Sequence, residues 1–212
     1  MEHVWEDVME DKRWTHAAWM AIGAAALTPA NFLLSFLADL RIGSGAAGLM
    51  IAVMALIVGT TAAALSLIAL YRFRELLNER YDYHGIDTLV TFVIVAISLL
   101  TFVGIVGRLL VAVVGRGETA SVSMALLFVV PIALLGMATG VVSIIAGVKL
   151  LSLENDLQHL IRPYAVISII GGACLAVIIL APLGMFTLII ENIVLALLFF
   201  RANESQPTVD FV

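Results

Sequence analysis

The chain has 212 residues, of which 62% are hydrophobic and 13% are charged, and its mean hydropathy is +1.11. Soluble domains contain about a quarter charged residues, so this composition excludes a water-soluble globular protein and predicts an integral membrane protein with the lipid bilayer around it. The formal net charge of -5 argues against nucleic acid as a partner, because nucleic-acid-binding surfaces are basic.

The first sixteen residues are acidic and place apolar side chains at helical spacing. These side chains are Val4, Trp5, Val8 and Met9. An amphipathic pattern of this kind is typical of a helix that lies on the membrane surface, so we expect an N-terminal interfacial helix over residues 1–16. The alternative is an acidic tail in water.

Six apolar segments follow, and each is close to the length that a helix needs to cross the hydrocarbon core of about 30 Å. Their expected bounds are 17–38, 46–71, 88–114, 121–148, 164–180 and 185–200, and 201–212 form a polar tail. We therefore predict an all-α protein with a single membrane domain, 1–212, and six transmembrane helices. The last two segments are expected to be separated by a turn at 181–184, because this stretch contains Pro182 and Gly184.

Two amphipathic connectors join the expected spans at the end that also holds both termini. They cover residues 72–85 and 149–163, where apolar and charged residues alternate at helical spacing. This end holds eight of the eleven lysines and arginines, and lysine-rich and arginine-rich loops face the cytoplasm. We expect cytoplasmic termini and connectors, in a plasma (inner) membrane.

The second and fourth spans resemble each other. A shift of 77 residues lays Gly59 on Gly136 and Ser66 on Ser143, and the same shift lays the first span on the third and the third on the fifth. The chain therefore reads as three helical hairpins of one plan, through internal duplication or through the chance similarity of apolar sequences.

Small residues follow one face of the second and fourth spans and form what we call the small-residue seam. Its members are Gly59, Ser66, Gly136, Gly140, Ser143 and Gly147. In lipid, helices associate through close backbone approach along such residues. We expect these two spans to be central helices that pack against each other or against a second copy of the chain. The alternative is a groove for a ligand.

Glu191 is an acidic residue within an apolar segment. An ionised carboxylate costs about 2.5–3.5 kcal/mol at the centre of a membrane helix, so it needs a partner or a cavity. Counted at about 1.5 Å per residue, Glu191, Arg108 and Asn31 lie at a similar depth below the outer surface. With Asn192 they form a predicted polar intramembrane cluster. This cluster is either a binding or permeation site, or a structural clasp between arginine and glutamate.

The sequence shows no HExxH, GxSxG, P-loop or GxGxxG motif, so we expect no enzyme activity and no catalytic residues. The histidines lie near the expected interface and match no ligand motif, so neither a metal nor another cofactor is expected. The leading hypothesis is a non-enzymatic scaffold, accessory subunit or homo-oligomer that acts through helix packing with other membrane subunits or copies of itself. The alternative is a small transporter or channel with a polar site in the outer half of the membrane.

Overall fold

The computed structural model describes residues 2–40, 46–114, 118–153, 158–177 and 180–204. These residues form helices, with no strand among them: α1 (Glu2–Leu40), α2 (Ala46–Tyr81), α3 (Asp87–Val114), α4 (Glu118–Leu151), α5 (Gln158–Ala176) and α6 (Ala181–Glu204). All six are long and apolar enough to cross a membrane. The prediction of an all-helical chain whose helix lengths and composition fit a multi-pass membrane protein is confirmed.

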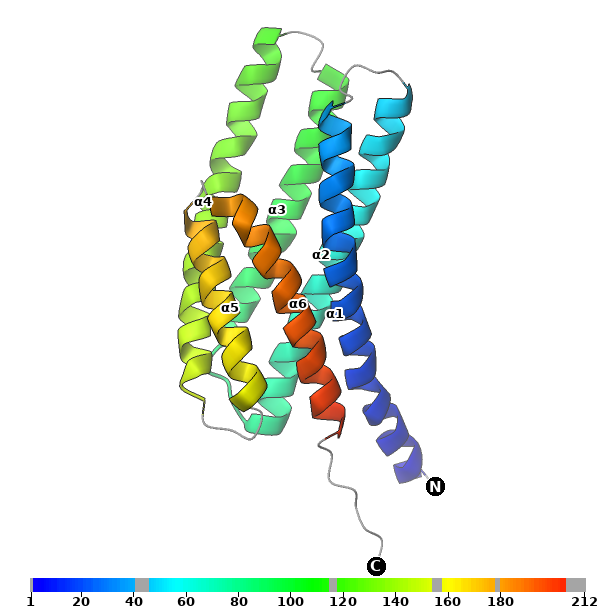
Figure 1. Ribbon diagram of the computed structural model, residues 1–212, viewed down its shortest axis with the longest axis vertical. Coiled ribbons are helices and arrows are strands. Elements are labelled where there is room, and N and C mark those ends of the chain that lie inside the picture. The colour runs from blue at the N-terminus through cyan, green and yellow to red at the C-terminus, as the bar shows by residue number, and fades with distance from the viewer. Residues whose placement is uncertain (1, 41–45, 115–117, 154–157, 178–179, 205–212) are drawn as a thin grey trace, which may run out of the picture.

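The helices run alternately up and down, and both ends of the chain lie at the same end of the bundle (Figure 1). Each helix packs against the next one in the chain, and α6 packs against α1, so the six helices close into a ring. An additional contact joins α6 to α2 across the ring. The third pair, α5 and α6, is short, and its upper end lies well below the upper ends of the other helices (Figure 1).

α1 is one continuous helix of 39 residues. At about 1.5 Å per residue it is roughly 58 Å long, about twice the thickness of the hydrocarbon core. The expected interfacial helix over 1–16 is therefore not separated from the first span, because no glycine or proline interrupts the chain before Gly23. The N-terminal end of α1 projects beyond the neighbouring helices (Figure 1).

The predicted turn at 181–184 is wrong. α5 ends at Ala176 and α6 begins at Ala181, so the connection lies at 177–180, and Pro182 stands in the first turn of α6. Proline is favourable there, because the first turn of a helix has no acceptor for the backbone N–H that proline lacks. The proline starts this helix and does not form the turn.

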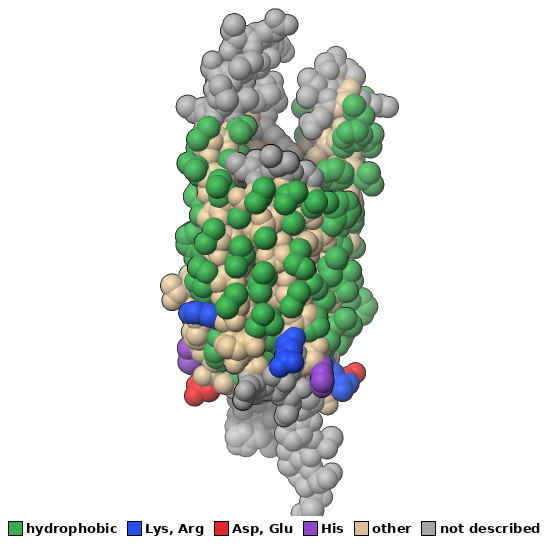
Figure 2. Space-filling model, turned by 60° about the vertical axis from the view of Figure 1, so that its left-hand side comes forward, with side chains coloured by type: hydrophobic (Ala, Val, Ile, Leu, Met, Phe, Trp, Pro, Cys, Tyr) green, Lys and Arg blue, Asp and Glu red, His purple; other side chains and the backbone are tan. Residues whose placement is uncertain are grey.

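Charged side chains gather at the end of the bundle that holds the termini, and hydrophobic side chains cover the surface above them (Figure 2). Arg74 Nε donates to Asp87 Oδ1 at 2.8 Å, which joins the end of α2 to the start of α3. Lys149 Nζ donates to the Gly85 carbonyl at 2.9 Å and joins the end of α4 to the same turn. Arg13 of α1 pairs with Glu79 of α2.

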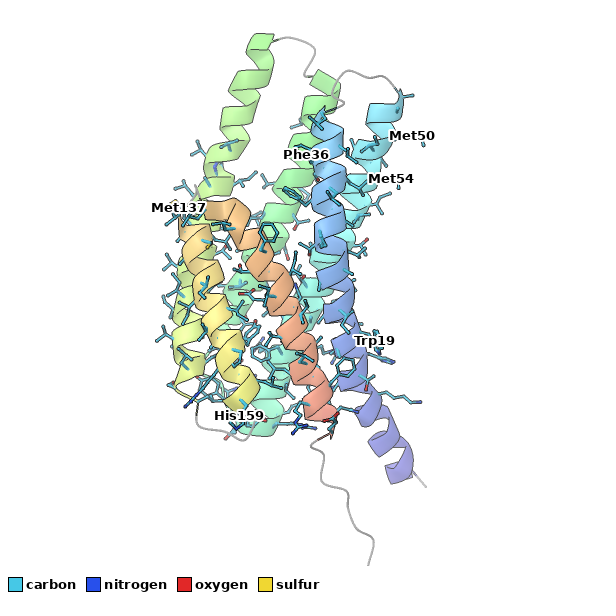
Figure 3. The ribbon with its side chains drawn as sticks, in the orientation of Figure 1. Trp19, Phe36, Met50, Met54, Met137 and His159 are labelled. Carbon is cyan, nitrogen blue, oxygen red and sulfur yellow. The ribbon has the colours of Figure 1, made fainter. Side chains whose placement is uncertain are left out.

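The apolar faces of the two connectors point into the protein and complete its core at the charged end. The buried members are Phe73, Leu76, Leu77, Leu150, Leu153 and Ile161, whereas Leu157 lies outside the described residues. Trp14 stacks on Phe199 with ring centroids 6.0 Å apart. Trp19, by contrast, is 61% exposed on the outside of α1 (Figure 3).

The small-residue face of α4 packs against α5 within the same chain. A Cβ atom on Gly140 would lie 2.5 Å from the Gly172 carbonyl oxygen, and one on Gly147 would lie 2.7 Å from the Ala165 carbonyl oxygen. Such distances are closer than real Cβ contacts, so both positions require glycine for this approach. α4 and α5 are among the most extensively packed helices, whereas α2 and α4 are not an extensively packed pair in the described chain.

The expected packing of the second span against the fourth is therefore not the arrangement in the structure. α5 has its own small residues, Ala165 and Gly172, on the face that contacts α4. Because small residues stand on both faces, α4 packs closely against α5 and not against α2. The remaining glycines of the seam differ: Gly59 lies against the Asn31 side chain of α1, whereas Gly136 has no neighbour within 4 Å in the described chain.

Replacing Gly140 by leucine is expected to lower the free energy of unfolding by about 2–3 kcal/mol, because the new side chain would be forced into the α5 backbone. Thermal unfolding in detergent, followed by circular dichroism, measures the loss. Gly136→Leu is the matched control, one turn away on the same helix, and should stay within about 0.5 kcal/mol of wild type. Equal effects of the two substitutions would contradict the described α4–α5 contact.

Candidate intramembrane site

A cavity of about 100 Å³ lies inside the helix ring. Most of its lining is apolar: Leu70, Phe73, Ile86, Val90, Val93, Ile97, Ala146, Leu150, Leu188 and Leu195. Five polar side chains line it as well: Ser66 from α2, Tyr164 and Ser168 from α5, and Glu191 and Asn192 from α6. We call these five residues and the space between them the Glu191 cavity. Its volume has room for a few water molecules or a small solute.

Glu191 lies over the face of α5 that carries Ser168 and Gly171. The Ser168 hydroxyl is placed to donate a hydrogen bond to the Glu191 carboxylate. A Cβ atom on Gly171 would come within 3.3 Å of Glu191 Oε1 and 2.6 Å of Thr187 Oγ1, so the absence of a side chain at Gly171 gives both residues their room. Glu191 has intermediate exposure, as expected for a side chain that faces a cavity.

Asn192 joins α6 to α2. Its Nδ2 donates to the Leu188 carbonyl at 2.9 Å and lies 3.3 Å from Ser66 Oγ, and the Ser66 hydroxyl lies 3.5 Å from Asn192 Oδ1. The Asn192 residue is 7% exposed, so this amide is buried and its polar atoms are satisfied by the two helices. The contact fixes the rotation of α6 and thereby turns the neighbouring Glu191 toward α5.

Tyr164 is the second titratable group of the cavity. The residue is 6% exposed, and its ring lies 4.8 Å, centroid to centroid, from the ring of Phe73. In the described part of the chain no group hydrogen-bonds to the Tyr164 hydroxyl. The cavity therefore contains a phenol group that is available to a ligand or to water.

The four residues of the predicted polar cluster do not all meet. Glu191 and Asn192 share the cavity, but Asn31 lies against Gly59, seven residues along α2 from Ser66, which is about 10 Å of helix rise. The Asn31 Oδ1 atom is buried and has no hydrogen-bond partner in the described chain.

The side chain of Arg108 lies outside the described residues, and its predicted ion pair with Glu191 stays a prediction. Its backbone position on α3 is eleven residues beyond Ile97, the last α3 residue that lines the cavity, and this is about 16 Å of helix rise. In the described chain no lysine, arginine or histidine forms an ion pair with Glu191.

The cavity lies nearer to the charged end of the bundle than the sequence predicted. Phe73, Ile86 and Leu150, which line it, belong to the connectors or stand beside them. The depth estimate assumed that all three helix pairs reach the same outer level, whereas the α5–α6 pair ends lower than the others (Figure 1). The cavity that contains Glu191 and Asn192 therefore lies toward the charged end of the bundle, and a polar site in the outer half of the membrane stays a prediction.

No group of three or more His, Cys, Asp or Glu side chains able to hold a metal ion occurs in the part of the chain that the structure describes. His16, His84 and His159 are exposed, and His159 lies at the charged end (Figure 3). The cavity itself offers one carboxylate, three hydroxyls and one amide. This set can bind a proton or a small cation, and it contains no paired base and nucleophile for acyl transfer.

The sequence prediction missed Tyr164 and Ser168. They stand four residues apart, with Gly171 three residues further on, so all three share one face of α5. This pattern of a phenol, a hydroxyl and a glycine on one face of an apolar helix could have indicated a polar partner for Glu191. Ser66 was predicted only as a member of the small-residue seam, and the structure places it against Asn192.

Comparisons of the chain with protein-family models, with curated proteins and with solved structures gave no match. The cavity is the feature of the described chain that points to a function, and its contacts can be tested individually.

The contact between Ser66 and Asn192 is expected to couple α2 and α6 by about 0.5–1 kcal/mol, the usual range for a hydrogen bond between membrane helices. A double-mutant cycle with Ser66→Ala and Asn192→Ala, based on unfolding in detergent, measures this coupling. Thr60→Ala is the matched control on α2, because its hydroxyl bonds to the Leu56 carbonyl of its own helix, and it should be additive with Asn192→Ala. Additivity of Ser66→Ala as well would rule the contact out.

Proposed function

We propose that the chain is a small membrane transporter and that the Glu191 cavity is its solute-binding site. The observation that carries this proposal is a carboxylate inside an apolar helix bundle that faces a cavity and has no cationic partner in the described chain. Acidic residues within membrane helices are costly, and they mark substrate or ion pathways when no structural partner neutralises them.

The structural alternative, a clasp that only holds helices together, would need a partner for the charge and a filled space around it. The basic residues of the described side chains lie at the charged end, whereas Glu191 stands ten residues before Arg201 on α6. The space around the carboxylate holds a cavity, and the Tyr164 hydroxyl in that cavity has no described hydrogen-bond partner. Both features favour a site that accepts a ligand.

The charged end is the side that we assign to the cytoplasm. Lysines and arginines near membrane spans concentrate on the cytoplasmic side, and the described ones concentrate at this end. The cavity then lies in the cytoplasmic half of a plasma (inner) membrane, and the short α5–α6 pair covers it.

The test is solute flux into liposomes that contain the purified protein, measured with a panel of small cations and neutral solutes. Wild-type protein should move at least one solute, and Glu191→Gln should reduce this flux by at least about tenfold, because the amide has no charge to bind a cation. Glu204→Gln is the matched control on the same helix and should transport like wild type, since Glu204 is exposed and pairs with Arg201. Equal flux with Glu191→Gln would refute this role for the cavity.

A second candidate function is that of an accessory subunit, and an apolar groove between α3 and α4 favours it. The groove has a volume of about 390 Å³ and is lined by Leu99, Leu100, Val103, Pro131, Ile132, Leu134, Leu135 and Ala138. Its α4 side lies beside Gly136, the seam glycine at which an added Cβ atom would meet no described atom within 4 Å. A transmembrane helix of another membrane subunit fits this surface, because small residues allow close helix approach.

If the groove holds a partner helix, native mass spectrometry of gently extracted protein should show a complex with another subunit. Ala138→Trp should abolish this complex by filling the groove. Val166→Trp, an exposed position on α5, is the control and should leave the complex intact. Wild-type protein that is found only alone would exclude the accessory function.

A further inference from the structure

We infer that the ligand of the Glu191 cavity is a small alkylammonium ion, which the protein exchanges for a proton. This inference rests on the proposed transport function and names the substrate class of the same site. It follows from three properties of the cavity: its single carboxylate, its apolar walls and its pair of aromatic rings.

The charge of the cavity selects a monovalent cation. Among the described residues that line the cavity, Glu191 is the one carboxylate, and none is a lysine, arginine or histidine. A monovalent cation neutralises this group once its proton has left, whereas an anion would meet no positive charge among the described lining residues. A divalent ion would leave an excess positive charge in an apolar environment, which is unfavourable.

The walls of the cavity select an organic cation over a metal ion. Hard metal cations such as Ca²⁺ and Mg²⁺ bind through several oxygen ligands, six or more when water is counted. Ten of the fifteen described lining residues are apolar, and the polar groups are spread over three helices. Two of these polar groups, the Asn192 amide and the Ser66 hydroxyl, are already bonded to each other. An alkylammonium ion needs only one carboxylate and a few hydroxyl acceptors at its N–H groups, and its methyl groups suit apolar walls.

The aromatic rings strengthen this choice. Phe73 and Tyr164 both line the cavity, and their centroids are 4.8 Å apart with the ring planes at 54°. An alkylammonium ion beside Glu191 would lie near these rings, whose faces attract organic cations. The Tyr164 hydroxyl, which has no described partner, supplies an oxygen for an N–H donor of the ligand. The volume of about 100 Å³ limits the ligand to a few heavy atoms.

The exchange for a proton follows from the position of the carboxyl group. In the empty cavity an ionised Glu191 would stand uncompensated among apolar side chains, so the group holds a proton. Binding of one alkylammonium ion releases this one proton, and the charge of the site does not change. Tyr164 is the other titratable residue that lines the cavity, and the lining residues of α2, α3 and α4 include none.

The experiment measures binding of radiolabelled methylammonium to the purified full-length chain in lipid nanodiscs, with a pH indicator in weak buffer to record proton release. Saturable binding with about one proton released per ion is expected. Glu191→Gln should weaken binding by at least about tenfold and abolish proton release, and Tyr164→Phe should weaken binding by about threefold. Ethylammonium, which keeps the N–H donors, should compete with methylammonium, and an equal concentration of sodium should not.

Two matched controls exclude general effects of the substitutions. Glu204→Gln removes an exposed carboxylate at the end of the same helix, and Tyr71→Phe removes an exposed phenol hydroxyl on α2. Both variants should bind methylammonium like wild type. Gel filtration shows whether Glu191→Gln folds. If it does not, the decisive comparison is the methylammonium affinity of Tyr164→Phe with that of Tyr71→Phe.

The outcomes separate this inference from the transport function. Glu191-dependent flux of another solute in liposomes, without methylammonium binding, would overturn the substrate class and leave transport standing. Methylammonium binding that depends on Glu191, without flux of any solute, would support the ligand class and refute transport. Displacement of methylammonium by sodium at equal concentration would overturn the choice of an organic cation.

Discussion

The close contact between α4 and α5 is the constraint on which the rest of the structure depends. Gly140 and Gly172 bring the two backbones so near that neither position has space for a Cβ atom. In lipid no water is expelled between helices, so packing of this kind must replace the hydrophobic effect. It holds the short α5–α6 pair on α4, and the pair in turn brings α6 against α1 and α2, which closes the ring.

Ring closure also explains how a polar site can exist in an apolar bundle. Asn192 bonds to Ser66 across the α6–α2 contact, and the adjacent Glu191 consequently faces Ser168 on α5. Polar groups that water cannot reach must find their hydrogen-bond partners within the protein. On one turn of α6, Asn192 therefore contacts α2 and Glu191 contacts α5. The Glu191 carboxyl group and the Tyr164 hydroxyl both face the cavity. The structure therefore combines a satisfied amide with a carboxyl group that faces a cavity and has no cationic partner in the described chain.

Polar contacts at the charged end join neighbouring helices just below the cavity. Arg74, Asp87 and Lys149 connect three helices at one turn, and the buried faces of both connectors complete the core beneath the cavity. The aromatic and aliphatic core is concentrated at the charged end, and the cavity begins directly above it.

The sequence by itself determined the membrane class, the six helices and the clustering of charge at one end, because hydrophobicity and helical spacing are local properties of the chain. It also identified Glu191 and Asn192 as unusual, since polar residues are rare in membrane spans. Only the tertiary structure decided that Glu191 meets Ser168 and Tyr164, and that the seam of α4 packs on α5. These contacts depend on the rotation of each helix about its axis and on the relative depth of the three helix pairs. Neither quantity is local, and the short α5–α6 pair places Glu191 at a different depth from the one counted along the sequence.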